Sequence, residues 1–91
     1  MKFALGQVYL TRGVNEKLGS DWAFAKFVSD CLRRHAEGDW GDLCAEDKEE
    51  NELSIKEGFR LLSAYQYQDQ KICIITEADR SATTVLFPDE Y

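Results

Sequence analysis

The segment Gly38–Leu43, with the sequence GDWGDL, constrains this chain more than any other feature. It separates two stretches of helical character and places a tryptophan between two glycines and two aspartates. Glycines beside an aromatic residue are typical of a tight turn, because glycine adopts backbone conformations that other residues avoid. We therefore expect this segment to fix the angle between two helices. Trp40 is interpreted as an aromatic plug of that corner, with Asp42 capping or bracing the second helix; the alternative is that Trp40 forms a recognition platform.

Residues 21–36 carry the clearest helical pattern in the chain. Apolar positions recur at three- and four-residue spacing, and the polar positions fall largely on the opposite side, which is typical of an amphipathic helix. Ser20 is the expected N-cap and Gly38 the expected C-cap. The basic residues 33–35 suit the negative C-terminal end of a helix. The apolar face comprises Phe24, Phe27, Val28, Cys31, Leu32 and His35 or Ala36.

A second helix is predicted over residues 45–57, ending at Gly58. Its only large apolar residues are Leu53 and Ile55, so we expect it to lie on the outside of the domain. Acid is concentrated here: residues 37–57 contain nine Asp or Glu residues against two Lys residues, a net charge of −7 within a total of −6. Such a charge attracts basic surfaces and repels nucleic acid and anionic membranes.

The N-terminal segment is expected to start with a strand. Residues 3–10 are mostly apolar, with aromatic and β-branched members, and Gly6 within them marks a bulge or a close backbone approach. A short helical turn over residues 14–18 follows, with Thr11 as the N-cap and Gly19 as the end of the turn.

The C-terminal third of the chain indicates three strands, over residues 59–67, 71–77 and 82–87, joined by turns at residues 68–70 and 78–81. The sequence therefore predicts a single α+β domain over residues 1–91. Its expected order is a short N-terminal strand, two helices and a three-stranded antiparallel meander, with the long helix packed on the sheet.

Composition limits the class of protein. Ninety-one residues suffice for one hydrophobic core. Three cysteines without a C-x-x-C pair fit free thiols in a reducing compartment. The apolar run after Met1 is too short for a signal peptide, and no stretch is long enough to cross a bilayer. We expect a folded cytoplasmic protein that binds neither nucleic acid directly nor membranes.

Catalytic and metal-binding motifs are sparse. Cys31 and His35 stand one helical turn apart, with Cys44 nearby in the sequence, but a zinc site usually has four ligands in recognisable pairs. The same Cys and His lack an evident third group for nucleophilic catalysis. No phosphate loop, dinucleotide fingerprint or Gly-x-Ser-x-Gly motif is present. We expect no metal and no cofactor, and a small metal- or thiol-dependent enzyme stays as an alternative.

The turn at residues 78–81, with Glu77 before it, groups two acids with an arginine. Asp79 has the position of an ordinary turn aspartate. Arg80 is expected to pair with Glu77 or with an aspartate of the GDWGDL segment. The alternative is that these charged residues form the polar rim of a surface that binds a partner.

Three segments of the chain together resemble a family of small bacterial proteins. The first is GDWGDL with the preceding residues 34–37, the second covers residues 58–65, and the third is IITEADRSATTVLFPDEY at residues 74–91. Members of that family are described as plasmid-related, or loosely as associated with type I restriction-modification. The resemblance implies no activity, cofactor or catalytic residue.

We expect the protein to be a non-enzymatic protein-interaction module whose partner has a basic surface. An alternative is that the acidic helix mimics the DNA backbone and inhibits a nucleic-acid-binding protein, as an anti-restriction protein does, because like charges spaced three, four and seven residues apart share one helix face. The sequence leaves the oligomeric state open. The candidate binding residues are Asp39, Trp40, Asp42, Glu46, Glu49, Glu50, Asp79 and Arg80.

Overall fold

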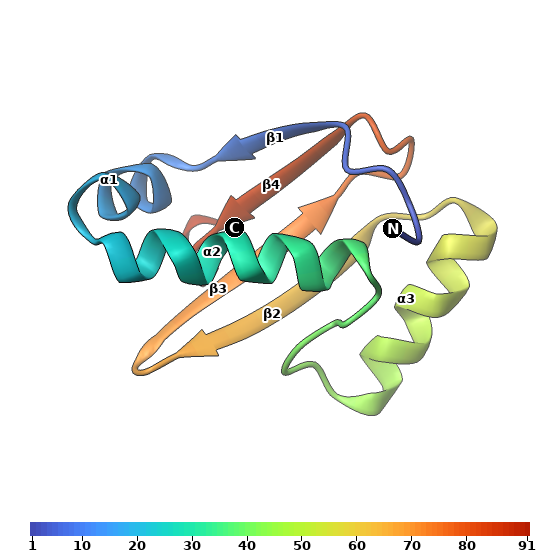
Figure 1. Ribbon diagram of the computed structural model, residues 1–91. Coiled ribbons are helices and arrows are strands. Elements are labelled where there is room, and N and C mark those ends of the chain that lie inside the picture. Colours follow the sequence, from blue (N-terminus) through green and yellow to red (C-terminus); the bar gives the residue numbers. More distant parts are fainter.

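A computed structural model covers residues 1–91 and shows an α+β fold, in which two helices cover one face of a four-stranded sheet and a third lies at its edge (Figure 1). The α+β class and the packing of the long helix on the sheet are confirmed. None of the helices is both long and apolar enough to cross a membrane. The elements are β1 (Gln7–Leu10), α1 (Arg12–Ser20), α2 (Trp22–Ala36), α3 (Ala45–Glu57), β2 (Leu61–Tyr67), β3 (Gln70–Thr76), β4 (Ala82–Leu86) and the 3₁₀ helix η1 (Pro88–Glu90).

The sheet is larger than the predicted three-stranded meander. Its strand order is β1-β4-β3-β2. β2, β3 and β4 pair antiparallel as expected, whereas β1 adds a fourth strand that runs parallel to β4, with Gln7 opposite Ala82 and Leu10 opposite Val85. The sheet is therefore mixed. A parallel partner from the far end of the chain leaves no local signal in the sequence, because parallel strands need a long crossover connection.

The first strand is shorter than predicted because of Gly6. This glycine has a φ of +67°, and a Cβ at this position would lie 2.3 Å from the carbonyl oxygen of Ser81. Only glycine fits such a close approach of two backbones. The hydrogen-bonded strand begins after it, at Gln7, whose N–H donates to the Ser81 carbonyl at 3.0 Å. The predicted close approach at Gly6 is thus confirmed.

The predicted short turn is a nine-residue helix, α1, which continues through Gly19 to Ser20. Asp21, rather than Ser20, then caps α2: its side chain accepts a hydrogen bond from the Phe24 N–H at 3.1 Å. The prediction of Ser20 as N-cap was wrong because α1 and α2 are almost continuous, and Ser20 still belongs to the helix before the break. The structure therefore has three α-helices instead of two.

The N-terminus of α1 is capped from the other end of the chain. Thr11 holds the N-cap position, but its side chain caps no backbone N–H of the helix. Instead the Thr11 hydroxyl donates to the Glu90 carboxylate at 2.5 Å, and the same carboxylate accepts from the Gly13 N–H at 3.0 Å. The Thr11 hydroxyl is also the main reason why the pKa of Glu90 lies below its usual value. Glu90 thereby ties η1 to α1.

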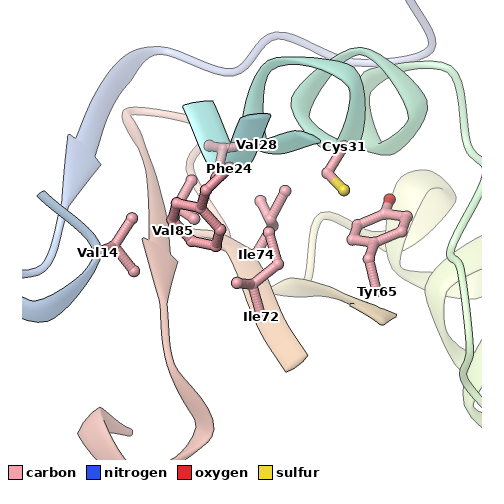
Figure 2. Packing of buried hydrophobic residues seen from close by; sticks show 8 residues of the cluster. All are labelled: Val14, Phe24, Val28, Cys31, Tyr65, Ile72, Ile74 and Val85. Carbon is pink, nitrogen blue, oxygen red and sulfur yellow. The ribbon is translucent and has the colours of Figure 1, made fainter. Parts of the chain in front are cut away.

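The core lies between the sheet and the two helices α1 and α2 (Figure 2). Burying one large apolar side chain, such as Phe or Leu, in this core contributes on the order of 2 kcal/mol to the stability of the fold. Leu10, Leu18, Phe27, Leu32 and Phe87 pack around its margin. The fully enclosed cluster comprises Val14, Phe24, Val28, Cys31, Tyr65, Ile72, Ile74 and Val85.

The predicted bounds of α3, residues 45–57, are confirmed, and Gly58 ends the helix with a φ of +77°. α3 lies beside β2 at one edge of the sheet (Figure 1). It buries only two residues, Asn51 and Ser54, and both are polar. The expected external position of this helix is confirmed.

Candidate functional site

The attachment of α3 to the sheet depends on Asn51. Its side-chain Nδ2 donates to the Leu62 carbonyl at 2.6 Å, and its Oδ1 accepts from the Leu62 N–H at 3.1 Å. The amide thus forms the same pair of bonds that a neighbouring strand would form with the edge of β2. A further bond joins the end of α3 to the turn before β4, because Arg80 Nη2 donates to the Ser54 carbonyl at 2.9 Å.

The GDWGDL segment covers the next part of the same strand edge. The Asp42 N–H donates to the Ala64 carbonyl at 2.7 Å, and the Ala64 N–H donates to the Trp40 carbonyl at 3.3 Å. Between them, Gly41 has a φ of +74°, and a Cβ there would lie 2.0 Å from the Ala64 carbonyl oxygen. The second glycine of the segment is therefore required by its contact with β2 as well as by the turn.

Trp40 plugs the corner between α2 and α3, as the favoured interpretation predicted. Only 4% of its surface is exposed. Its ring lies 6.0 Å from that of Phe3 in a stacked arrangement, and its Nε1 donates to the Glu52 carboxylate at 2.7 Å. A ring held in this way presents no face to a partner, so Trp40 cannot serve as a recognition platform in this conformation. Its role is to fix α3 relative to α2.

The two aspartates of the segment have different roles. Asp39 forms two bonds with Arg34, at 2.7 Å to Nε and 3.2 Å to Nη2, and the bond to Arg34 is the main cause of its lowered pKa. Asp42 is exposed, and the N-cap position of α3 belongs to Cys44, whose side chain makes no cap bond. The prediction that Asp42 caps or braces α3 was wrong, because its side chain bonds to nothing in that helix; its backbone N–H instead braces the GDWGDL segment against β2.

The turn at residues 78–81 is held by its own side chains. Asp79 accepts from the Ser81 hydroxyl at 2.6 Å and from the Ser81 N–H at 3.0 Å, and the hydroxyl is the main cause of the lowered pKa of Asp79. Arg80 forms no ion pair. It donates instead to backbone carbonyls, those of Phe59 at 2.7 Å and Ser54 at 2.9 Å among them. The predicted pairing of Arg80 with an acid was wrong because the ends of α3 and of the turn leave carbonyl groups that need donors.

The exposed side of α3 carries carboxylates that the protein leaves free of ion pairs. All of its acidic residues are exposed, and none of them takes part in any of the five ion pairs of the structure. Among them stands Leu53, 46% exposed, at three- and four-residue spacing from Glu49, Glu50 and Glu57. We define the α3 face as Glu46, Glu49, Glu50, Leu53 and Glu57.

His35 lies fully buried at the centre of a chain of hydrogen bonds. Thr83 donates to the Leu5 carbonyl at 2.7 Å, and Thr76 lies 2.7 Å from Thr83, so the Thr76 hydroxyl donates to Thr83. His35 Nε2 then donates to Thr76 at 2.9 Å. Burial keeps the ring neutral, so its Nδ1, which then carries no proton, accepts from the Ser63 hydroxyl.

This arrangement bears on three roles that the sequence suggested for His35: a charge at the C-terminal end of α2, catalysis with Cys31, and metal binding. Burial lowers the pKa of His35 to about 4, so the ring carries no charge to complement the C-terminal end of α2, contrary to prediction. Burial also raises the pKa of Cys31 to about 12, and Cys31 is only 1% exposed. Neither side chain can reach a substrate in this conformation. No three His, Cys, Asp or Glu side chains are grouped to hold a metal ion.

Sequence reasoning missed the residue that attaches α3. Asn51 stands among charged residues in a helix without an apolar face, so its hydrophobicity does not mark it as buried. The one available signal is its spacing from Ser54, since two small uncharged polar residues one turn apart interrupt an otherwise charged helix. Of the predicted binding residues, the structure brings Glu46, Glu49 and Glu50 together on α3. It assigns Asp39, Trp40, Asp79 and Arg80 to contacts within the protein.

Comparisons with models of protein families, with curated proteins and with solved structures find no match to this chain. Its function is therefore inferred from the residues and their geometry alone.

Proposed function

We propose that this protein is a non-enzymatic, cytoplasmic protein-interaction module, and that the α3 face binds a partner with a basic surface. The observation that carries the proposal is the set of exposed carboxylates around Leu53, none of which has an ion-pair partner within the protein. An exposed apolar side chain surrounded by charge resembles a small protein-binding surface, in which an anchor residue is enclosed by polar contacts.

The way α3 is attached supports the same role. The helix carries acidic residues at three- and four-residue spacing, and such like-charge pairs destabilise a helix by a few tenths of a kcal/mol each. Asn51 and the Glu52–Trp40 bond nevertheless hold it at a fixed place on the sheet edge. A basic partner would neutralise the repulsion on binding, so part of the binding free energy comes from a strain that the free protein retains.

The proposal is tested with a variant that changes Glu46, Glu49 and Glu50 to Gln. Glu52 is left unchanged because it holds Trp40. Proteins captured from a bacterial lysate by the immobilised wild type are quantified against those captured by the variant. We expect partners that are lost with the variant and that dissociate as the salt concentration rises, because exposed charges are screened.

A charge-matched control separates the α3 face from net charge. Glu16→Gln, Asp69→Asn and Asp89→Asn together remove the same three charges from exposed positions outside α3. This control is expected to capture the same partners as the wild type. Identical capture by all three proteins would contradict the proposal, and so would equal losses from the variant and the control.

A second candidate function is mimicry of a DNA backbone. It is favoured by the length of the carboxylate row, since Glu46 and Glu57 lie about 16 Å apart along the helix axis. The resemblance to proteins loosely associated with restriction-modification makes a type I restriction enzyme the first target. We expect a micromolar excess of the protein to inhibit DNA binding by that enzyme at low salt and to lose this effect as salt rises. Unchanged DNA binding and cleavage at low salt would exclude this target.

A further inference from the structure

The two edges of the sheet differ. Along β2, the side chain of Asn51 and the backbone of the GDWGDL segment bond to Leu62 and Ala64, so this edge is covered. β1 forms the opposite edge, and no element lies beyond it (Figure 1). Unpaired backbone groups on such an edge are a template for pairing with another strand. Two of its side chains, Val8 and Tyr9, are 45% and 55% exposed.

The backbone groups that point away from the sheet follow from the pairing with β4. The Gln7 N–H donates to Ser81 and the Thr11 N–H donates to Val85, so residues 7, 9 and 11 direct their backbone groups toward β4. Successive residues of a strand direct their N–H and C=O groups alternately to one side of the strand and to the other. The N–H and C=O groups of Val8 and Leu10 therefore point outward, and no hydrogen bond outside the regular elements uses them.

We propose that β1 pairs antiparallel with β1 of a second copy of this chain, about a two-fold axis at Tyr9, to form a continuous eight-stranded sheet. In this register Val8 of one copy and Leu10 of the other exchange two backbone hydrogen bonds, and the symmetry repeats them. The pairs across the axis match in character. Val8 faces Leu10, an apolar pair, Gln7 faces Thr11, a polar pair, and Tyr9 faces Tyr9, an aromatic pair of the kind that stabilises neighbouring strands.

The distribution of charge favours a second copy at this edge. The four residues of β1 carry no charge, so self-pairing brings no like charges together. The acidic α3 lies at the β2 edge, on the far side of the sheet. Seven strand spacings then separate the two outermost strands, about 34 Å. That distance exceeds the Debye length of about 8 Å at physiological salt, so the two α3 helices hardly repel each other.

The oligomeric state tests this proposal, by sedimentation equilibrium of the full chain over a range of concentrations. The paired strands are short, so we expect a reversible dimer that forms in the micromolar range and that changes little with salt. Tyr9→Lys places two lysines opposite each other at the axis and should weaken the dimer by at least about tenfold. Trp22→Lys makes the same substitution at an aromatic residue that is 81% exposed on α2, and should leave the dimer unchanged.

A disulfide test fixes the register and does not depend on the charge variants. Residues at position 9 of the two copies form a non-hydrogen-bonded pair with Cα atoms about 4.5 Å apart, within the range of a disulfide. In a Cys44→Ser background, Tyr9→Cys should form a covalent dimer on mild oxidation. Gln7→Cys, whose counterpart in the second copy lies beyond disulfide reach, should not.

Four outcomes would overturn the proposal. They are a wild type that stays monomeric at every concentration, a Tyr9→Lys variant that folds and dimerises normally, equal weakening by Trp22→Lys, and equal crosslinking at positions 7 and 9. Circular dichroism establishes that each variant is folded. Because the α3 face takes no part in this pairing, the dimer can fail while binding to a basic partner persists, and the reverse.

Discussion

α2 and α3 are joined to the same sheet by different kinds of contact. α2 presents Phe24, Val28 and Cys31 to the core and is fixed by apolar burial. α3 buries only Asn51 and Ser54 and is fixed by hydrogen bonds. Apolar burial is favourable over the whole area removed from water, whereas a hydrogen bond contributes about 1 kcal/mol net because water competes for it.

One helix therefore stabilises the domain, and the other is attached to it. Removal of the contacts of α2 would expose the core, whereas release of α3 would mainly uncover one strand edge and Trp40. A helix held by few polar bonds is free to keep an outer surface suited to another molecule. We expect substitutions on the two helices to differ in how much they change the free energy of unfolding, and in whether the change is confined to one helix or extends through the domain.

The largest effect is expected from Phe24→Ala on α2. Phe24 is fully buried against Phe27 and Phe87, so truncation leaves a cavity in the core. The free energy of unfolding should fall by about 3–5 kcal/mol, as measured by urea denaturation. The matched change on α3, Leu53→Ala, should lower it by less than about 0.5 kcal/mol because that side chain is half exposed. Equal losses would contradict the distinction between the helices.

The next largest effect is a loss of stability in mild acid, through His35. Its pKa is lowered by burial from 6.5 to about 4, so the unfolded chain binds a proton that the folded protein does not bind. This contribution is complete above pH 6.5 and is lost as the pH falls toward 4, with a total on the order of 3 kcal/mol.

The variant His35→Gln removes the titration and isolates this contribution. Urea midpoints measured between pH 6.5 and pH 5 should fall for the wild type and stay nearly level for the variant. This pH range lies above the usual pKa values of carboxyl groups, so their protonation contributes little to the change in stability. Parallel slopes for the two proteins would show that His35 is not held neutral.

Asn51→Ala should have a smaller effect that is confined to α3. It leaves the N–H and C=O of Leu62 without partners at a partly buried position, at a cost of about 1–3 kcal/mol. Hydrogen exchange should accelerate in α3 and remain unchanged in α2. Asn51→Asp keeps the acceptor for the Leu62 N–H but sets a second carboxylate oxygen against the Leu62 carbonyl in place of the donor, so its effect should be at least as large as that of Ala. Uniform acceleration across the domain would contradict local attachment.

The smallest effect is expected from Glu50→Gln on the outer side of α3. Glu50 lies one turn from both Glu46 and Asp47, so its neutralisation relieves two repulsive pairs. The variant should be more stable than the wild type by a few tenths of a kcal/mol, and the gain should vanish in high salt. Lys48→Gln provides the opposite change in charge and should be slightly destabilising. A loss of stability in Glu50→Gln would show that this carboxylate has a partner within the protein.

The helices could be predicted from the sequence better than the sheet. The apolar spacing of α2 and the Gly58 stop of α3 are local signals, and both predicted helices were confirmed. β1 was predicted as a strand, but its parallel pairing with β4 was not, because that contact joins opposite ends of the chain. The capping of α1 by Glu90 escaped prediction for the same reason.

The sequence predicted the charge of the candidate site but not the arrangement of the residues around it. Concentrated acid pointed to α3, and the carboxylates there are exposed. Arg80 and Trp40 were candidates for binding because their chemistry is typical of binding sites, yet both are occupied by partners within the protein. Residue type alone cannot separate these roles, since a guanidinium group satisfies buried carbonyls as readily as it binds a partner.

Native-state hydrogen exchange of the wild type, residue by residue, measures the difference between α2 and α3 without any substitution. Amides in the middle of α2 should exchange only through global unfolding, with the same free energy and denaturant dependence as the whole domain. Amides of α3 should exchange through a local opening of lower free energy that depends little on denaturant. A single free energy and a single denaturant dependence for both helices would contradict this distinction, because α3 would then be as much a part of the cooperative core as α2.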